Sequence, residues 1–380
     1  MNIDINLLKE PFYKGSVQNI HLLEDYPEYM VCETTTGGSV FDVGTIFHIP
    51  NSDIYRAALR HKIYTALEDK EQWMKFVGIF PDNLKTHHIG MIDAVTGEVV
   101  SGKFPDNISR FNVVKRFNVK KPVQVKLDKL ILWDYSDVYR GDDMVIPLEN
   151  IVRFGITPSS SIYKKFVKLT NEEQEKFLQE YGVDKIEPWG YFKEPRVDFT
   201  TKYEPEDRAL DFQEALYIST LSGEKYIKLF EYTKLCSLFV KSFFAQIGLD
   251  LWDLKWEFAK EGNNLIVVDT IDTDSIRVTM KIDNKYIHFN KQAIRDYYIK
   301  FHPDWIEEIN KSKNRAKETG KPFQKYLKEK YPEPPEIDGQ FIEIQSRKLE
   351  VIFKFSIGNI SAGRAVELLR EIGREELDFF

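Results

Sequence analysis

Charged residues alternate with large apolar ones in the run LWDLKWEF, and their spacing suits chemistry on a phosphate group. Asp253, Lys255 and Glu257 fall on one face of a predicted strand, because successive side chains of a strand point to opposite faces. Residues 261–264 predict a turn, and the apolar run after it predicts a returning strand that brings Asp269 opposite Glu257, to within about one residue. Two facing carboxylates beside a lysine can hold a divalent cation that carries a phosphate.

The same pattern has a structural alternative. A strand with one charged face is most often the solvated side of an antiparallel sheet, where the charges only keep the surface polar. A second charged cluster follows closely, formed by Asp272, Asp274, Ser275 and Arg277. The pattern alone leaves both the metal–phosphate site and the solvated face open.

Composition excludes several classes of protein. The 380 residues are 42% hydrophobic and 14% aromatic, which is enough for a packed core and for more than one ordinary domain. The net charge of −7 argues against nucleic-acid binding through bulk charge. Two cysteines need no disulfide framework, so we expect a reducing, cytoplasmic location. We expect no membrane span, because no apolar run is long enough, and the N-terminus lacks the pattern of a signal peptide.

Several elements are predicted around the charged cluster. Two strands are expected over residues 12–34, and Gly15 interrupts the first of them. A helix is expected after Pro50, and a longer amphipathic helix is expected to end at Gly248. Residues 82–140 predict additional strands to which we assign no chemistry.

The C-terminal part of the chain predicts a separate unit. Residues 311–335 are basic and end in prolines, which predicts a solvated helix and a linker. The run FIEIQSRKLEVIFKF alternates like a strand, and AGRAVELLREIG predicts a helix capped by Ser361.

Two motifs carry a resemblance to a known family. The pattern Asp-x-Lys-x-Glu-Phe, followed by Asp269 and then Asp-Ser-x-Arg, resembles the C-terminal half of SAICAR synthetases, the phosphoribosylaminoimidazole-succinocarboxamide synthases of purine synthesis. The run Pro147–Arg153, followed by Ser159, resembles the Pro-Leu-Glu-x-Ile-Val-Arg segment and nearby serine of the same family. Weaker matches occur around Asp42 and Lys291, and together the matches cover roughly residues 12–300.

The resemblance implies an α+β fold with two lobes, similar in layout to ATP-grasp enzymes. A β-rich N-terminal lobe, residues 1–146, would cover ATP, and a mixed α/β C-terminal lobe, residues 147–310, would carry the metal and the substrate. Residues 311–335 would form a basic linker. Residues 336–380 would form a small appended β/α extension without a counterpart in the family, available to an unknown partner.

The implied activity is that of an ATP-dependent carbon–nitrogen ligase that uses Mg²⁺. The carboxylate of carboxyaminoimidazole ribotide would take the γ-phosphoryl group of ATP, and the amine of aspartate would then displace phosphate. The partners would be this nucleotide and this amino acid, with no membrane and no nucleic acid.

The resemblance also implies roles for individual residues. Lys255, Glu257 and Asp269 would be catalytic, and the two carboxylates would bind Mg²⁺. Contacts with ATP would come from Lys14, Gly15, Met144, Ile146, Glu149 and Lys255. Contacts with the nucleotide and amino-acid substrates would come from Asp42, Arg153, Ser159, Lys202, Asp207, Asp274, Ser275, Arg277, Lys291 and Arg295.

The sequence departs from the family pattern at charged positions. A lysine pair of the family corresponds here to Ser16 and Gln18, its Asp-Glu pair ends in Thr270, and its Ser-Pro-Asp begins with Asp272. Such changes can alter the substrate without abolishing the use of ATP. Two alternatives therefore stay open. One is a related ligase for another carboxylated nucleotide or amine, and the other is a non-catalytic nucleotide-binding protein.

Overall fold

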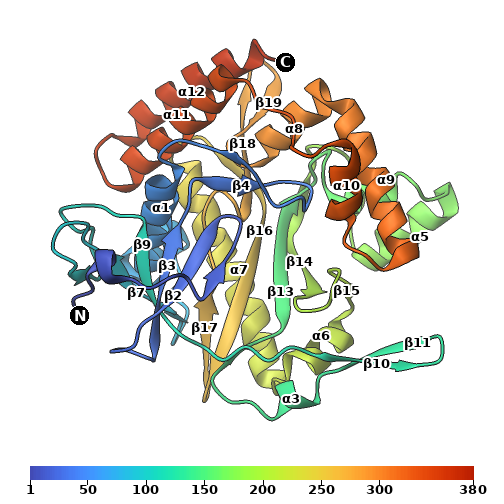
Figure 1. Cartoon of the computed structure of the whole chain (residues 1–380), viewed down its shortest axis with the longest axis horizontal. Helices are drawn as coiled ribbons and strands as arrows, with labels where there is room; N and C mark the ends of the chain where they lie inside the picture. The colour runs from blue at the N-terminus through green and yellow to red at the C-terminus, as the bar shows by residue number, and fades with distance from the viewer.

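The computed structural model describes residues 1–380, and its N-terminal part is built on an antiparallel sheet of six strands (Figure 1). In spatial order these strands are β1 (Tyr13–Lys14), β2 (Gln18–Leu22), β3 (Tyr29–Thr34), β9 (Phe111–Lys115), β7 (His88–Ile92) and β8 (Val99–Val100). A tight turn joins β1 to β2, where the N–H of Gly15 donates to the carbonyl of Gln18 at 2.9 Å. A Cβ at Gly15 would lie 2.7 Å from that oxygen, so the turn requires glycine.

A second sheet of nine strands forms the centre of the molecule. Its main path runs through β15 (Ala209–Leu210), β14 (Tyr191–Thr201), β13 (Leu148–Gly155), β16 (Asp250–Glu261), β17 (Asn264–Val268) and β6 (Lys85–Thr86). Strands β12 (Met144–Val145), β18 (Ile276–Ile282) and β19 (Lys285–His288) complete it. All pairs are antiparallel except β17 with β6. Two separate hairpins are β4 (Gly37–Ser39) with β5 (Thr45–His48), and β10 (Val123–Leu127) with β11 (Leu130–Asp134).

Helices cover the sheets and enclose the main core. The two that contribute most to the site and the core are α1 (Ser52–Leu67) and α7 (Gly223–Ala245). The others are α2 (Lys70–Phe76), α3 (Ser136–Tyr139), α4 (Ser161–Phe166), α5 (Asn171–Tyr181), α6 (Phe212–Ser219), α8 (Gln292–Phe301), α9 (Pro303–Thr319), α10 (Phe323–Lys330), α11 (Gly339–Ser356), α12 (Ala362–Leu377) and a short 3₁₀ turn at Ile5–Leu7. None of these helices is long and apolar enough to cross a membrane.

The predicted strand pair around the 261–264 turn is confirmed. Strands β16 and β17 pair in a register that sets Glu257 opposite Val268, so Asp269 is one residue away, as expected. The indole of Trp256 donates to Ser237 of α7 at 2.8 Å and anchors the apolar face of β16. The predicted helix that ends at Gly248 is also confirmed by α7, and the glycine has the left-handed conformation, with φ +71°.

The predicted strand over FIEIQSRKLEVIFKF is wrong, because these residues lie in α11. The buried residues Phe341, Ile344, Val351 and Ile352 recur at helical rather than alternating spacing. The predicted helix after it is confirmed as α12, and Ser361 accepts from the N–H of Arg364 at 3.3 Å.

The predicted basic linker is mostly helical. Residues 311–335 lie largely in the second half of α9 and in α10, and these helices pack against each other. Trp305, Ile309 and Leu327 are buried in a second apolar cluster that includes Val40 from the N-terminal part. The proposed boundaries at 146/147 and 310/311 stay predictions.

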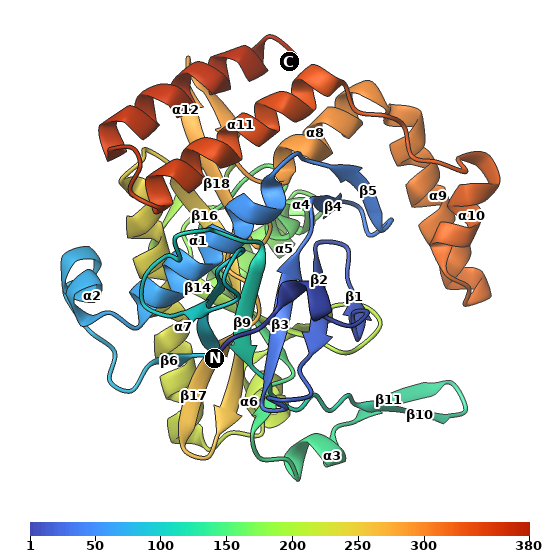
Figure 2. The same ribbon diagram turned by 60° about the vertical axis from the view of Figure 1, so that its left-hand side comes forward.

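The C-terminal helices belong to the main core. Helix α11 lies along α1, and α12 packs on β18 (Figure 2). The ammonium of Lys348 is buried, donates to the carbonyl of His288 at 2.7 Å and pairs with Glu376 of α12. Residues 336–380 therefore pack against both α1 and the large sheet.

Removing the cation of this buried pair should destabilise the whole chain. We expect Lys348→Met to lower the free energy of unfolding by about 3–5 kcal/mol, because Glu376 would be left buried without its cation. The double variant Lys348→Met/Glu376→Leu should recover most of the loss. Urea unfolding followed by circular dichroism measures both.

The matched control is Lys354→Gln on the same helix. Lys354 forms a half-exposed pair with Glu350, so its loss should cost less than about 1 kcal/mol. A Lys348→Met protein that unfolds like the wild type would show that the buried pair contributes little to the stability of the core.

Candidate active site

Five charged side chains meet where four neighbouring segments of the large sheet lie side by side, and we call them the carboxylate–lysine cluster. The strand order β14-β13-β16-β17 places these segments next to one another. The members are Glu149 on β13, Lys202 directly after β14, Lys255 and Glu257 on β16, and Asp269 directly after β17.

Lysine side chains connect the carboxylates of this cluster. The Nζ of Lys255 lies 2.6 Å from Glu149 Oε1, 3.1 Å from Glu257 Oε1 and 4.0 Å from Asp269 Oδ2. Lys202 forms a second ion pair with Glu257. Because the side chain of Glu257 is only 3% exposed, water screens these contacts weakly.

The protonation of the cluster follows from this burial. Burial and the nearby Asp269 raise the pKa of Glu257 above its ordinary value. Burial also opposes ionisation of Asp269. The charge of Lys202, the hydrogen bond with Glu257 and the charge of Lys255 together outweigh this burial, so the pKa of Asp269 is lowered. Two adjacent carboxylates that share a proton are a place where a cation can bind and displace that proton.

The backbone of Asp269 is held in an unusual conformation. Its φ of +69° lies in the left-handed region, which is costly for a residue with a side chain. The hydroxyl of Tyr64 donates to the carbonyl oxygen of Asp269 at 2.6 Å, and Nε2 of His87 lies 3.1 Å from the same oxygen. These two contacts hold Asp269 beside Glu257. The sequence reasoning assigned a role to neither residue.

The carboxylates of Glu257 and Asp269 could hold a magnesium ion that arrives together with a nucleotide. No group of three or more His, Cys, Asp or Glu side chains is arranged to hold a metal ion. Magnesium commonly takes only one or two carboxylates and fills its other positions with water and phosphate oxygens. Glu257 and Asp269, which contact each other, match that requirement.

A second group, which we call the arginine cluster, lies on adjoining strands. Nε of Arg153 donates to Asp198 at 2.6 Å, and Nη1 of Arg277 donates to Asp253 at 2.6 Å. Arg153 and Asp253 are direct partners across β13 and β16, and their nearest charged atoms are 3.9 Å apart. The structure thus brings together Arg153 and Arg277, which lie far apart in the chain.

A loop hydroxyl links the predicted Ser159 to this cluster. Nη1 of Arg277 also donates to Oγ1 of Thr157 at 3.1 Å, and that hydroxyl lies 3.3 Å from Oγ of Ser159. Nε of Arg277 is buried and has no hydrogen-bond partner. A buried free N–H at this position can donate to a bound carboxylate or phosphate.

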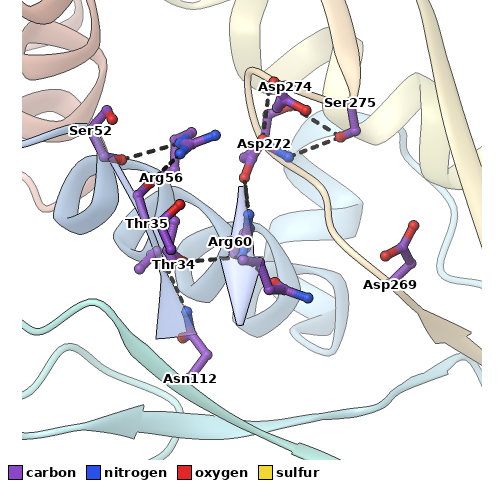
Figure 3. Close-up of polar contacts among 12 residues, drawn as sticks. Thr34, Thr35, Ser52, Arg56, Arg60, Asn112, Asp269, Asp272, Asp274 and Ser275 are labelled. Atoms are coloured by element: carbon purple, nitrogen blue, oxygen red, sulfur yellow. Dashed lines mark hydrogen bonds and ion pairs between the residues drawn. The ribbon is translucent and has the colours of Figure 1, made fainter. Parts of the chain in front are cut away.

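Arg60 of α1, which the sequence reasoning missed, explains two departures from the family pattern. Nε of Arg60 donates to Asp272 at 2.6 Å, and Nη1 donates to Thr34 at 3.1 Å (Figure 3). Nη1 also donates to Gln18 at 2.6 Å. Arg60 is 3% exposed and Asp272 is fully buried. A lysine at position 18 would bring a second cation next to Arg60, whereas glutamine accepts its hydrogen bond.

The loop after β17 also orders the remaining predicted substrate residues. Oδ1 of Asp272 accepts from the N–H of Asp274 at 2.7 Å, and the hydroxyl of Ser275 bonds to the backbone of Asp272. Nζ of Lys291 lies 3.1 Å from Asp274. Arg295 donates to Gln292 at 3.2 Å and forms no ion pair.

Other predicted residues have surface partners or none. Lys14 is exposed and pairs with Glu10, and Asp42 is exposed and pairs with Lys313 of α9. Asp207 is exposed overall and has no hydrogen bond or ion pair. Its carboxyl group is partly buried, and this burial and the nearby Glu149 raise its pKa.

The predicted ATP contacts at Met144 and Ile146 stay a prediction. Both side chains are buried in the main core, so only their backbone atoms remain for a nucleotide. Val145 points to the other face, where it packs with Val268 in a small apolar cluster.

Comparisons of the sequence with known proteins point to one family. The sequence matches the SAICAR synthetase family over residues 11–312. A putative phosphoribosylaminoimidazole-succinocarboxamide synthase of Archaeoglobus fulgidus is 30% identical over 239 residues, which cover 61% of this chain and 65% of that protein. A phosphoribosylaminoimidazole-succinocarboxamide synthase of Thermoplasma acidophilum is 24% identical over 291 residues, covering 75% and 82%. The chain thus spans slightly less than two thirds of the length of the first relative.

Solved structures match the fold. SAICAR synthase from Saccharomyces cerevisiae, complexed with SAICAR, aligns with a TM-score of 0.56 at 18% identity, over 94% of this chain and 98% of that one. The family match ends at residue 312, so the expectation that residues 336–380 have no counterpart in the family stays a prediction. The fold is mixed α+β, and the chain belongs to the SAICAR synthetase family.

Proposed function

We propose that this protein is an ATP-dependent carbon–nitrogen ligase that joins the carboxylate of carboxyaminoimidazole ribotide to the amine of aspartate. The observation that carries the proposal is the carboxylate–lysine cluster, in which Glu257 and Asp269 face each other beside Lys202 and Lys255. Family membership supports the same activity.

The chemistry requires activation of a carboxylate. A substrate carboxylate oxygen attacks the γ-phosphorus of ATP and ADP leaves, which gives an acyl phosphate. The amine of aspartate then attacks the acyl carbon, loses a proton and expels inorganic phosphate. The protein contributes mainly position and charge, because the phosphoryl group itself supplies the leaving group.

Each cluster has a part in this proposal. Glu257 and Asp269 would hold Mg²⁺, which neutralises phosphate charge when bound, and Lys202 and Lys255 would turn from these carboxylates to the phosphate oxygens. The arginine cluster, with the free Nε of Arg277, would hold the nucleotide substrate.

The finer layout is also part of the proposal. The six-stranded sheet, within residues 1–146, would cover ATP in the manner of ATP-grasp enzymes, and the Gly15 turn would approach its phosphates. Residues 147–310 would carry the metal and the substrate. The uncharged Gln18 leaves fewer cations on the covering lobe, so Lys202 and Lys255 carry more of the phosphate charge.

A related ligase with a different amine or carboxylated nucleotide is the second candidate. The observation that favours it is the Arg60–Asp272 pair, which places a buried ion pair at a position where the family pattern has serine. This pair orders the loop that carries Asp274 and Ser275.

We expect carboxyaminoimidazole ribotide, aspartate and MgATP to give ADP and the succinocarboxamide product in equal amounts. Glu257→Gln and Asp269→Asn should each lower kcat by about a hundredfold or more, because each removes a ligand of the Mg²⁺ ion that would neutralise the charge of the transferred phosphoryl group. Coupled detection of ADP, with chromatography of the product, measures both.

The matched control is Glu261→Gln at the end of the same strand, whose carboxylate pairs with Lys115 away from the cluster. Its kcat should stay near that of the wild type. Wild-type protein that releases no ADP above background with these substrates would overturn the assignment. Release of ADP only with another amine would favour the second candidate.

The contact between Tyr64 and the Asp269 carbonyl gives a separate prediction. We expect Tyr64→Phe to raise the Mg²⁺ concentration for half-maximal activity by about fivefold, because a fivefold change corresponds to the loss of roughly one hydrogen bond. The kcat at saturating Mg²⁺ should change little. Electron paramagnetic resonance of Mn²⁺ with ADP measures the same weakening without turnover.

Tyr55→Phe is the control on the same helix, because its ring packs on Phe353 of α11. If Tyr64→Phe bound Mn²⁺ as tightly as this control, the contact would have no role in placing the metal ligands.

A further inference from the structure

The hairpin of β10 and β11 extends away from both large sheets in both views of the molecule (Figures 1 and 2). It forms a separate two-stranded sheet, in which Val125 is paired with Leu132 and Leu127 with Leu130. Paired residues, and residues two apart on one strand, lie on the same face of a sheet. One face is therefore apolar along its length, and we call it the hairpin face; it consists of Val123, Val125, Leu127, Leu130 and Leu132.

The hairpin face is open to solvent. Its five side chains are between 43% and 71% exposed. Monomeric soluble proteins rarely expose a large contiguous apolar patch, and such a patch commonly marks an interaction site. An isolated two-stranded hairpin is also only marginally stable in water, so a layer that covers the face would stabilise it.

The chain itself anchors the opposite face of the hairpin. Trp133 points to that face and packs against the main core. Tyr135, directly after the hairpin, is buried in the same core, and its hydroxyl donates to Glu204 at 2.8 Å. These anchors hold the base of the hairpin, so the hairpin face is presented to solvent in a defined orientation.

The charges at the two ends of the hairpin face complement each other. Lys129 lies in the turn at the tip, and Asp134 lies at the base, two residues after Leu132 and therefore on the hairpin face. Both residues are exposed, and neither forms an ion pair within the chain. Two copies of the hairpin that stack face to face in opposite directions would bring Lys129 of each copy beside Asp134 of the other.

The same charges disfavour insertion of the hairpin into a lipid bilayer. The tip would enter the lipid first, and it carries the charged pair Asp128 and Lys129. Asp134 would then approach the lipid with the rest of the hairpin face. Charged groups are costly in hydrocarbon, whereas a second hairpin offers an apolar centre and an opposite charge at each end.

We propose that two copies of this chain associate through the hairpin face, around a two-fold axis that runs across the strands between the two stacked hairpins. Such an axis places β11 on β11, so that Leu132 lies near Leu132 of the other copy. The same patch serves both partners, as in other two-fold pairs. A face of five side chains is small beside the roughly 800 Å² per partner of a standard interface, so we expect a dimer that dissociates at micromolar concentrations.

Sedimentation velocity of the full chain, from low to high micromolar concentration, tests the association. We expect the wild type to pass from monomer to dimer over this range. Leu127→Glu/Leu132→Glu should raise the dissociation constant about a hundredfold or more, because association would bury four carboxylates against apolar groups. Circular dichroism and the melting temperature check that this variant keeps the wild-type fold.

The matched control is Val95→Glu/Val167→Glu, which adds the same charge at two exposed apolar residues outside the hairpin. It should dimerise as the wild type does. A wild type that stays monomeric at every concentration would overturn the proposal. A dimer that the Leu127→Glu/Leu132→Glu variant forms equally well would overturn it too, because another surface would then join the copies.

Two further sets of variants test the arrangement of the copies without disrupting the apolar face. Lys129→Glu and Asp134→Lys should each weaken the dimer about fivefold, and the double variant should recover the loss, because the charges again pair between copies. Leu132→Cys should form a disulfide-linked dimer under mild oxidation, whereas Val95→Cys should not. The two native cysteines are buried, so they do not compete. No recovery in the double variant, together with no cross-link at Leu132→Cys, would rule out the stacked arrangement.

A flotation measurement with vesicles of phosphatidylcholine and phosphatidylserine tests the lipid alternative. We expect the wild type to stay unbound. A wild type that floats with the vesicles through the hairpin face and stays monomeric without them would show that lipid covers this face, and the proposal would be wrong.

Discussion

The site depends on keeping two carboxylates next to each other in a buried place. Glu257 and Asp269 repel when both are ionised, and burial makes the repulsion stronger. Lys255 and Lys202 offset this repulsion. Strand pairing fixes the positions of Lys255 and Glu257 and of the residues directly before Lys202 and Asp269. In the proposed reaction, the same two ammonium groups are the ones available to phosphate oxygens when a cation takes the carboxylates.

Helix α1 connects this cluster to the rest of the site. Arg56, Arg60 and Tyr64 are spaced by four residues and so lie on one face of the helix. Arg56 supports the hairpin of β4 and β5, Arg60 fixes the Asp272 loop, and Tyr64 holds the carbonyl of Asp269. One helix face therefore sets the position of the proposed metal site relative to the loop that carries Asp274 and Ser275.

The parts predicted correctly from the sequence are those that local geometry determines. Alternation on β16 and a short turn were enough to place Asp269 within one residue of Glu257. The polar stripe on α1 was missed because the prediction of that helix used its apolar residues. The side-chain partners of Arg60 lie 26, 42 and 212 residues away in the chain, and no local pattern indicates such contacts. Helix α11 was mistaken for a strand because a short run of apolar residues can fit both the two-residue period of a strand and the 3.6-residue period of a helix.

The central claim is that the protein uses ATP to activate a carboxylate beside the carboxylate–lysine cluster. An isotope measurement tests it directly: carboxyaminoimidazole ribotide carrying ¹⁸O in both carboxylate oxygens is converted with MgATP and aspartate, and the released phosphate is analysed by mass spectrometry. The account predicts one ¹⁸O in each phosphate and one retained in the amide product. Unlabelled phosphate formed together with ADP would contradict it, because water and not the carboxylate would then have accepted the phosphoryl group.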